Sequence, residues 1–324
     1  MRHLGSALSR TARRSAGRRS GATLAMALLL AACGGGGGDS GSIGPPPVAG
    51  ATGTLSINIT DAPIDAAIGA VVQFAGVALK RFGEPETVIA FDVPLRIDLL
   101  SLRPGESLPL LPATSVPAGA YESMRLLIDS APDSLDSHLV LAGGAQRPLY
   151  VPAAAASGLR LGQGFTVPAG GLGAFTIDFD LRQSVLPPVS SAGPFPMRPI
   201  LRLVDNARIG AVAGTVTPAT LTNASCPFPL NPALNSNQVY VFAGWNVAPD
   251  DIDRSAPEPV TTATVGPTVL GAWSWRAAFL PPGPYTVAFT CQGALDNPET
   301  SEALTFFGAR NVTVQADATT LVDF

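Results

Sequence analysis

Apolar residues recur at every second position in several short stretches of this sequence, as they do in β-strands. The clearest case is residues 174–182, where polar residues separate Phe175, Ile177, Phe179 and Leu181. Successive side chains of a strand point to opposite faces, so this pattern predicts a strand with one buried and one solvent-facing side. No long stretch shows the 3.6-residue apolar period of an amphipathic helix.

The same pattern predicts strands elsewhere, with turns rich in Gly and Pro between them. These strands cover residues 54–60, 70–79 with a bulge near Ala75 and Gly76, 121–129, 209–216, 239–242, 311–314 and 319–324, and a strand–turn–strand covers residues 271–289. Short alternating strands at close spacing are typical of antiparallel sandwiches. The sequence therefore predicts an all-β chain with two antiparallel β-sandwich-like domains after a signal peptide and a flexible linker.

The first 32 residues have the layout of an export signal. Six arginines and no acidic residue lie in residues 1–21, and residues 22–32 form an apolar run. That run is shorter than the roughly 20 residues that span a bilayer, so it predicts a cleaved signal peptide over residues 1–32. The stretch Leu30-Ala31-Ala32-Cys33 resembles the lipobox of bacterial lipoproteins. The resemblance implies that the Cys33 thiol carries diacylglycerol, with palmitate among its acyl chains; the alternative is an ordinary signal with an incidental cysteine.

The residues after the signal divide into a tether and two larger units. Residues 33–52 are rich in Gly and Pro and predict a flexible tether. We expect one β-rich domain over residues 53–206 and a second over residues 207–324. Gly34 follows the cysteine where an Asp would signal retention at the inner membrane, so we expect a lipid-anchored protein of the outer membrane, at its periplasmic face or at the cell surface.

Removal of the signal changes the charge. The six arginines leave with it, so 14 basic and 24 acidic residues remain, a net charge of −10. This acidic balance excludes nucleic acid as an expected partner and leaves no polybasic patch for anionic lipid. The expected partners are the membrane, through the lipid, and an envelope protein or a glycan; the sequence does not indicate the oligomeric state.

Cysteine use agrees with export. With Cys33 assigned to lipid, Cys226 and Cys291 remain, and an even pair in an exported chain predicts a disulfide. Closing this loop stabilises the domain by roughly 4 kcal/mol through lost entropy of the unfolded chain. The alternative is two buried free thiols.

Both units resemble known families. Residues 53–206 resemble a bacterial domain of unknown function found mostly in lipoproteins. The resemblance rests on four stretches that include Thr60-Asp-Ala-Pro63 and Asp178-Phe-Asp180, and they are residues 53–63, 117–126, 175–184 and 198–204. Residues 208–324 resemble a carboxypeptidase regulatory-like, or transthyretin-like, sandwich through Gly271, Trp273 and Leu280-Pro-Pro-Gly-Pro-Tyr285. Neither resemblance implies a reaction, a cofactor or a ligand.

Residues suited to catalysis are scarce after the signal. One histidine, His138, and one lysine, Lys80, occur there. No Gly-x-Ser-x-Gly elbow accompanies His138, which we expect at the surface or capping a turn, and Lys80 lies in no Ser-x-x-Lys motif. We therefore expect a protein that is not an enzyme and has no cofactor apart from the covalent lipid, with calcium as the open alternative.

Carboxylates are the main candidates for a metal site. Asp178 and Asp180 share a face of the predicted strand, with Cβ atoms roughly 7 Å apart, which would suit a glycosidase pair or, with Asp61, a calcium site. A solvated strand face, with Arg182 offsetting the charge, is the simpler interpretation, and Asp61 would cap a turn. The run Asp250-Asp-Ile-Asp253 lacks the EF-hand pattern, so we expect a solvated loop there.

Trp273 and Trp275 are the candidate ligand-binding residues. They lie two apart on one strand, and exposed aromatic pairs stack on sugars, although paired tryptophans are more often core residues. The favoured function is therefore a non-catalytic, lipid-anchored binding or scaffolding protein of the cell envelope. The alternatives are a carboxylate-based glycan-active enzyme and a calcium-stabilised adhesion or glycan-binding module.

Overall fold

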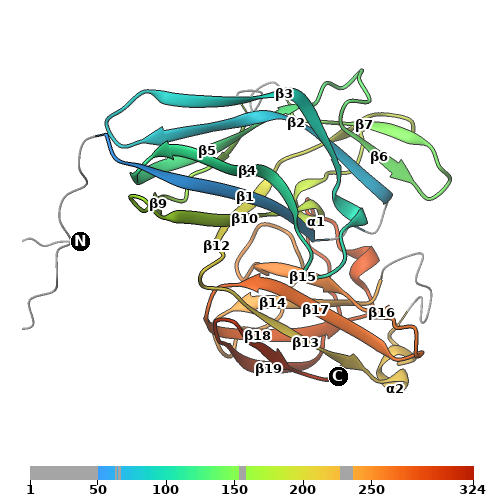
Figure 1. Cartoon of the computed structure of the whole chain (residues 1–324). Coiled ribbons are helices and arrows are strands. Elements are labelled where there is room, and N and C mark those ends of the chain that lie inside the picture. The colour runs from blue at the N-terminus through green and yellow to red at the C-terminus, as the bar shows by residue number, and fades with distance from the viewer. Residues whose placement is uncertain (1–49, 63, 65–66, 153–157, 227–235) are drawn as a thin grey trace, which may run out of the picture. The chain divides into compact units, whose positions relative to one another are not determined.

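The computed structural model describes residues 50–62, 64, 67–152, 158–226 and 236–324, all within one compact unit, Pro46–Phe324. These residues form mostly strands, and the predicted all-β class is confirmed (Figure 1). The predicted signal peptide, Cys33 and most of the tether lie outside the described residues. In the part of the chain that the structure describes, no helix is both long enough and apolar enough to cross a membrane.

The first sandwich contains two sheets. One has the strand order β12-β10-β1-β4, and the other has the order β11-β7-β6-β2-β5-β8 with β3 beside β2 and β9 beside β5. The elements are β1 (Thr52–Ala62), β2 (Ala67–Arg81), β3 (Glu86–Asp98), a 3-10 turn (Leu99–Ser101), β4 (Leu108–Pro117), β5 (Gly119–Asp129), β6 (His138–Leu141), β7 (Gln146–Tyr150), β8 (Leu159–Leu161), β9 (Phe165–Val167), β10 (Leu172–Asp180), α1 (Leu181–Ser184), β11 (Phe195–Pro196) and β12 (Ile200–Asp205).

The core of this sandwich follows the alternation in the sequence. Leu55, Ile57 and Ile59 of β1 are fully buried, as are Phe74 and Met124 from the other sheet. Two pairings in this sandwich differ from the expected antiparallel arrangement, because β1 runs parallel to β10 and β11 runs parallel to β7. Alternation has the same period in parallel and antiparallel strands, so the sequence pattern does not distinguish the two.

The predicted bulge in the second strand is present. The pairing of β2 with both β3 and β5 shifts register between Phe74 and Gly76. A Cβ atom on Gly76 would lie 2.5 Å from the Ile89 carbonyl oxygen, so the backbones of β2 and β3 approach too closely for a side chain.

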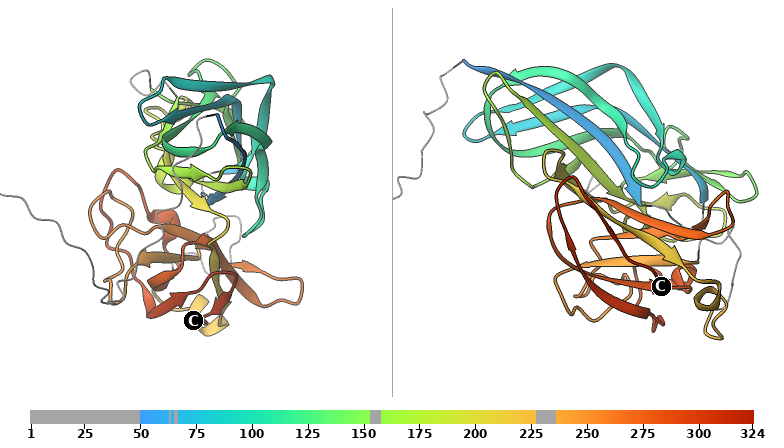
Figure 2. Two further views of the ribbon diagram at one scale, coloured as in Figure 1. Left: turned by 60° about the vertical axis from the view of Figure 1, so that its left-hand side comes forward. Right: turned by 60° about the horizontal axis from the view of Figure 1, so that its bottom comes forward.

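The second sandwich follows β12 along the chain (Figures 1 and 2). One sheet has the order β16-β17-β13-β20 and the other the order β15-β14-β18-β19. The elements are β13 (Gly210–Val216), α2 (Pro218–Leu221), β14 (Gln238–Ala243), β15 (Thr261–Thr264), β16 (Gly266–Pro267), β17 (Trp273–Leu280), β18 (Gly283–Thr290), a 3-10 turn (Gly293–Leu295), β19 (Phe307–Val314) and β20 (Thr319–Leu321). The structure contains the predicted disulfide between Cys226 and Cys291, which borders the core between these sheets.

A Pro-x-Gly-x-Tyr turn recurs in both sandwiches. The Tyr121 hydroxyl donates to the Pro117 carbonyl oxygen at 2.7 Å, and the Tyr285 hydroxyl donates to the Pro281 carbonyl oxygen at 2.9 Å. The intervening glycine has a positive φ in each case, 128° at Gly119 and 158° at Gly283. L side chains rarely adopt this conformation. Each sandwich therefore begins one of its long strands with the same tyrosine-anchored turn.

Two long loops cover the outer face of β14. Tyr240 and Phe242 point away from the main core and form a separate buried cluster with Ile252, against which Phe306 packs. Ile252 belongs to the loop of residues 244–260 between β14 and β15. Phe306 ends the loop of residues 291–306 between β18 and β19. The apolar contacts hold the two loops together on one sheet face.

Candidate metal centre

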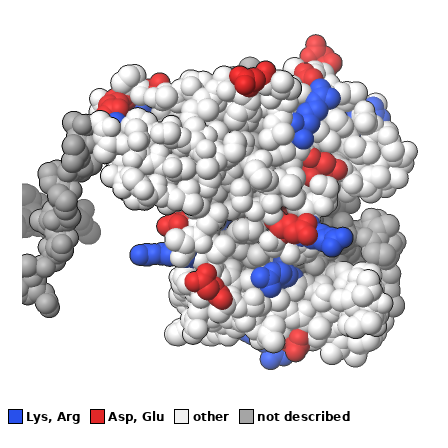
Figure 3. Space-filling view, viewed as in Figure 1, with Lys and Arg blue, Asp and Glu red and all other residues white. Residues whose placement is uncertain are grey.

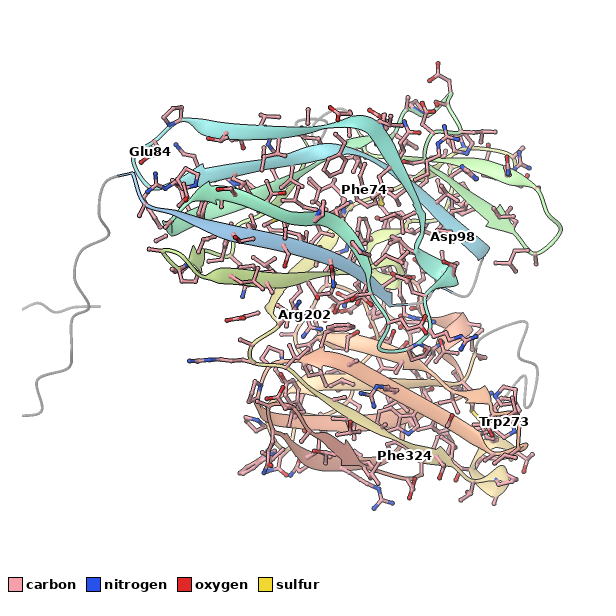
Figure 4. The ribbon with its side chains drawn as sticks, viewed as in Figure 1. Phe74, Glu84, Asp98, Arg202, Trp273 and Phe324 are labelled. Atoms are coloured by element: carbon pink, nitrogen blue, oxygen red, sulfur yellow. A yellow bond between two sulfur atoms is a disulfide. The ribbon has the colours of Figure 1, made fainter. Side chains whose placement is uncertain are left out.

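The predicted carboxylates of the first sandwich are buried and paired. Asp178 is 5% exposed, and its Oδ2 accepts a hydrogen bond from Arg202 Nη2 at 2.5 Å (Arg202 is labelled in Figure 4). Asp180 is 4% exposed and caps α1, since its two carboxylate oxygens accept from the backbone N and the Nε2 of Gln183, both at 2.9 Å. Burial raises the pKa of Asp180 to about 6, against the lowering effect of those hydrogen bonds.

The expectation of a solvated strand face here is wrong. The strand ends at Asp180, and Arg182 lies in α1, so it does not share a strand face with the two aspartates. Asp61 Oδ1 accepts the backbone N–H of Leu181, the first residue of α1, at 3.3 Å, and its expected capping of the turn after β1 stays a prediction. Asp61, Asp178 and Asp180 thus hold the ends of neighbouring elements together, and a metal at these three residues stays a prediction.

The tryptophans do not form an exposed platform. Trp275 is 3% exposed and packs on Phe324, with ring centroids 5.9 Å apart. Trp273 is partly buried against the same core (both Trp273 and Phe324 are labelled in Figure 4). The prediction that Trp273 and Trp275 bind a ligand together is wrong for this fold, because the strand face they share is the core face. Trp245, at 58% exposed, is the accessible indole.

His138 is buried at the start of β6. One ring nitrogen, Nδ1, lies 2.8 Å from the Leu135 carbonyl oxygen. The histidine therefore closes the turn that leads into β6, which matches the expected capping role and not the expected surface position.

A carboxylate cluster lies where the two loops on β14 meet. Oxygen atoms of Asp251, Asp296 and Glu302 all lie within 4.8 Å of one another. Asp251 comes from the loop of residues 244–260, and the other two come from the loop of residues 291–306. We refer to these three residues as the loop carboxylates.

Hydrogen bonds fix the loop carboxylates in place. Asp251 Oδ2 accepts from the Glu302 backbone N–H, and Asp296 accepts from the Ile252 backbone N–H at 3.1 Å and from the Tyr240 hydroxyl. Glu302 Oε2 accepts from the Asn297 backbone N–H at 3.0 Å. Backbone N–H groups hold all three carboxylates, and the Tyr240 hydroxyl also holds Asp296. The loop conformation therefore keeps the three carboxylates close together.

Two acidic groups at this place, Asp296 and Glu258, have raised pKa values. Burial raises the pKa of Asp296 to about 6, and Asp251 adds to the rise, while Tyr240 and Arg182 oppose it. Burial also raises the pKa of Glu258 to about 7, with Asp253, Asp251 and Asp250 adding to the rise. Burial and neighbouring carboxylates therefore disfavour the ionised forms of Asp296 and Glu258, which lie close to Asp251.

The sequence indicated only part of this cluster. The expected solvated loop at Asp250–Asp253 is wrong for Asp251, which is 1% exposed. Asp296 and Glu302 lie 45 and 51 residues further along the chain, and no motif surrounds them. Ile252 between two aspartates was the available signal, because an apolar residue in an acidic run implies that one side of the loop is buried.

A known protein family matches the first sandwich. Residues 52–199 match the family described as "Domain of unknown function (DUF4382)". The match covers the first sandwich from β1 to the residues just before β12, close to the predicted unit of residues 53–206. The DUF4382 region therefore contains Asp61, Asp178 and Asp180, whereas the loop carboxylates lie outside it. No curated protein matches the chain.

Solved structures resemble the chain only distantly. A leucine-rich repeat protein from Bacteroides thetaiotaomicron is 13% identical, with a TM-score of 0.19; the match covers 84% of this chain and 26% of that one. The minor pilin GBS52 from Streptococcus agalactiae is 9% identical, with a TM-score of 0.19 and coverage of 83% and 94%. A putative cell adhesion protein from Bacteroides fragilis is 8% identical, with a TM-score of 0.20 and coverage of 83% and 92%. The chain thus spans about a quarter of the length of the first, and TM-scores this low carry no argument about function.

Proposed function

We propose that this protein is a non-catalytic binding or scaffolding protein of the bacterial cell envelope, held at the outer membrane by a lipid on Cys33. The observation that carries the proposal is the pairing of cysteines. The sequence has three, and Cys226 and Cys291 are joined to each other. Disulfides persist outside the reducing cytoplasm, so the pair supports export, and Cys33 is the remaining thiol, placed in the lipobox-like stretch.

The described polar residues support a role without catalysis. His138, Asp178 and Asp180, the groups best suited to acid–base or nucleophilic chemistry, each hold a turn, a neighbouring strand or a helix end. The face in view in Figure 3 carries scattered charges of both signs among large uncharged areas. This face carries no basic patch of the kind that binds anionic lipid.

Metabolic labelling with radioactive palmitate tests the anchor. We expect label on the wild-type protein, no label on Cys33→Ala, and full label on Ser40→Ala, a matched control in the tether. Cell fractionation should place the wild type with outer membranes and should release Cys33→Ala from them. Equal labelling of wild type and Cys33→Ala, or none on either, would overturn the proposed anchor.

A further inference from the structure

The loop carboxylates are held by hydrogen bonds and not by ion pairs among the described residues. Within the described residues, no Lys or Arg forms an ion pair with Asp251, Asp296 or Glu302. The Arg182 guanidinium lies close enough to lower the pKa of Asp296. Buried charges are otherwise paired or bound to a metal, because removing a carboxylate from water is costly.

Two carboxylate oxygens at this place are buried without any hydrogen-bond partner. Oδ1 of Asp251 is one, in a residue that is 1% exposed, and Oε2 of Glu258 is the other. Asp251 thus presents a buried, unsatisfied acceptor within the acidic cluster, as a carboxylate that binds a cation would.

We propose that Asp251, Asp296 and Glu302 form a calcium site that fastens the two loops to the outer face of β14. Calcium–oxygen distances are about 2.3–2.6 Å, so two ligand atoms of one ion are at most about 5 Å apart. The three carboxylates meet this limit, since their oxygens lie within 4.8 Å of one another. Glu258 and Asp250 stand beside them and add negative charge.

The donor set selects calcium among common biological cations. All the ligating groups are carboxylates, with no His or Cys in the cluster, whereas zinc favours nitrogen and sulfur. Magnesium keeps several of its waters and demands a near-octahedral shell, while calcium accepts irregular shells of about 6–8 oxygens. Three side chains from two irregular loops, completed by water and backbone carbonyl oxygens, suit calcium.

The site goes beyond the proposed envelope role and does not depend on it. Calcium would add a third link between two loops that already share hydrogen bonds at Asp251 and Asp296 and the small apolar cluster around Ile252. Its binding is measured on the protein itself, and lipidation at Cys33 plays no part in the readout. Failure of one proposal therefore leaves the other standing.

The test is calcium titration of the full-length protein in detergent after treatment with EDTA, followed by calorimetry and thermal unfolding. We expect one calcium per chain, a rise in melting temperature of about 3–6 °C at tenfold excess over Kd, and a response to magnesium at least tenfold weaker. Absence of a calcium response in the wild-type protein would overturn the site.

Variants locate the ion. We expect Asp251→Asn and Glu302→Gln each to weaken calcium binding at least tenfold, and Asp92→Asn, at an exposed carboxylate on β3, to leave it unchanged. If Asp251→Asn fails to fold, the calcium affinity of Glu302→Gln tests the site, because Glu302 is more exposed. Wild-type affinity in Glu302→Gln would overturn the assignment. Loss of binding in Asp61→Asn, with retention in Glu302→Gln, would place the ion in the first sandwich instead.

Discussion

At the scale of single residues, the tyrosine turns show how one short motif serves two sandwiches. Pro117-Ala-Gly-Ala-Tyr121 and Pro281-Pro-Gly-Pro-Tyr285 share no other feature than the spacing of Pro, Gly and Tyr. In both, the glycine adopts a positive φ and the hydroxyl returns to the proline carbonyl four residues earlier. The hydroxyl satisfies a carbonyl that the turn would otherwise leave without a donor.

Removal of either hydroxyl should therefore destabilise the protein by a similar amount. We expect Tyr121→Phe and Tyr285→Phe each to lower the free energy of unfolding by about 1 kcal/mol, the usual net value of one hydrogen bond. Urea denaturation at neutral pH measures the change. Tyr150→Phe, at the end of β7, is the matched control, and a loss there as large as in the other two would contradict the assignment to the turn.

Asp180 gives stability a pH dependence of predictable sign. Its pKa is about 6 in the folded protein and 3.8 in the absence of the fold, because burial disfavours the charged form. The unfolded chain loses this proton first, so the contribution of Asp180 to stability is full below about pH 4 and declines as the pH rises through about 6. About two pKa units correspond to ~3 kcal/mol.

Asp180→Asn should remove this dependence. In EDTA, we expect the variant to gain stability relative to wild type as the pH rises from about 4.5 to about 7.5, since the amide stays neutral and can still accept from the Gln183 backbone N–H. Chemical denaturation at the two pH values measures the difference. Asp92→Asn is the control, and a parallel pH profile for Asp180→Asn and wild type would contradict the prediction.

At the scale of elements, the sequence pattern predicted several strands that pack one face on the core, and it missed β4. The predicted strand and bulge at residues 70–79 correspond to β2, and residues 239–242 lie within β14. By contrast, β4 contains three prolines and shows little alternation. It borders only β1, and edge strands tolerate proline because one side needs no backbone donors. The sequence alone does not reveal which strand becomes an edge.

Close backbone approach is a second property that only the structure reveals. A Cβ atom on Gly214 of β13 would lie 1.6 Å from the Val322 carbonyl oxygen, next to the pairing of β13 with β20. We expect Gly214→Ala to lower the free energy of unfolding by about 2 kcal/mol or more through forced backbone movement. Gly266→Ala in β16 is the control, since nothing lies within 4 Å of a Cβ there. Equal stability of the two variants in urea would contradict the prediction.

At the scale of the whole molecule, the sequence predicted the disulfide and not the candidate metal site. The disulfide followed from two cysteines in a chain expected to be exported, whereas the loop carboxylates depend on tertiary contacts between loops some 45 residues apart. Residues 239–242 of β14 are all apolar, and such a run indicates a strand that is buried on both faces. Val239 and Val241 face the main core, whereas the two loops cover Tyr240 and Phe242, and the run alone does not say which residues cover them.

Experiments on the three cysteines should therefore distinguish lipidation at Cys33 from stabilisation by the disulfide between Cys226 and Cys291. The disulfide closes a loop with a sequence separation of 65 residues, and its removal in Cys226→Ala/Cys291→Ala should lower the free energy of unfolding by roughly 4 kcal/mol. Palmitate labelling should persist in that variant, because Cys33 is intact. Cys33→Ala should show the reverse, with wild-type stability in detergent and no label. Loss of label on removal of the disulfide alone, in protein that is still exported, would mean that lipidation depends on the folded sandwich and is not read from the lipobox-like residues alone.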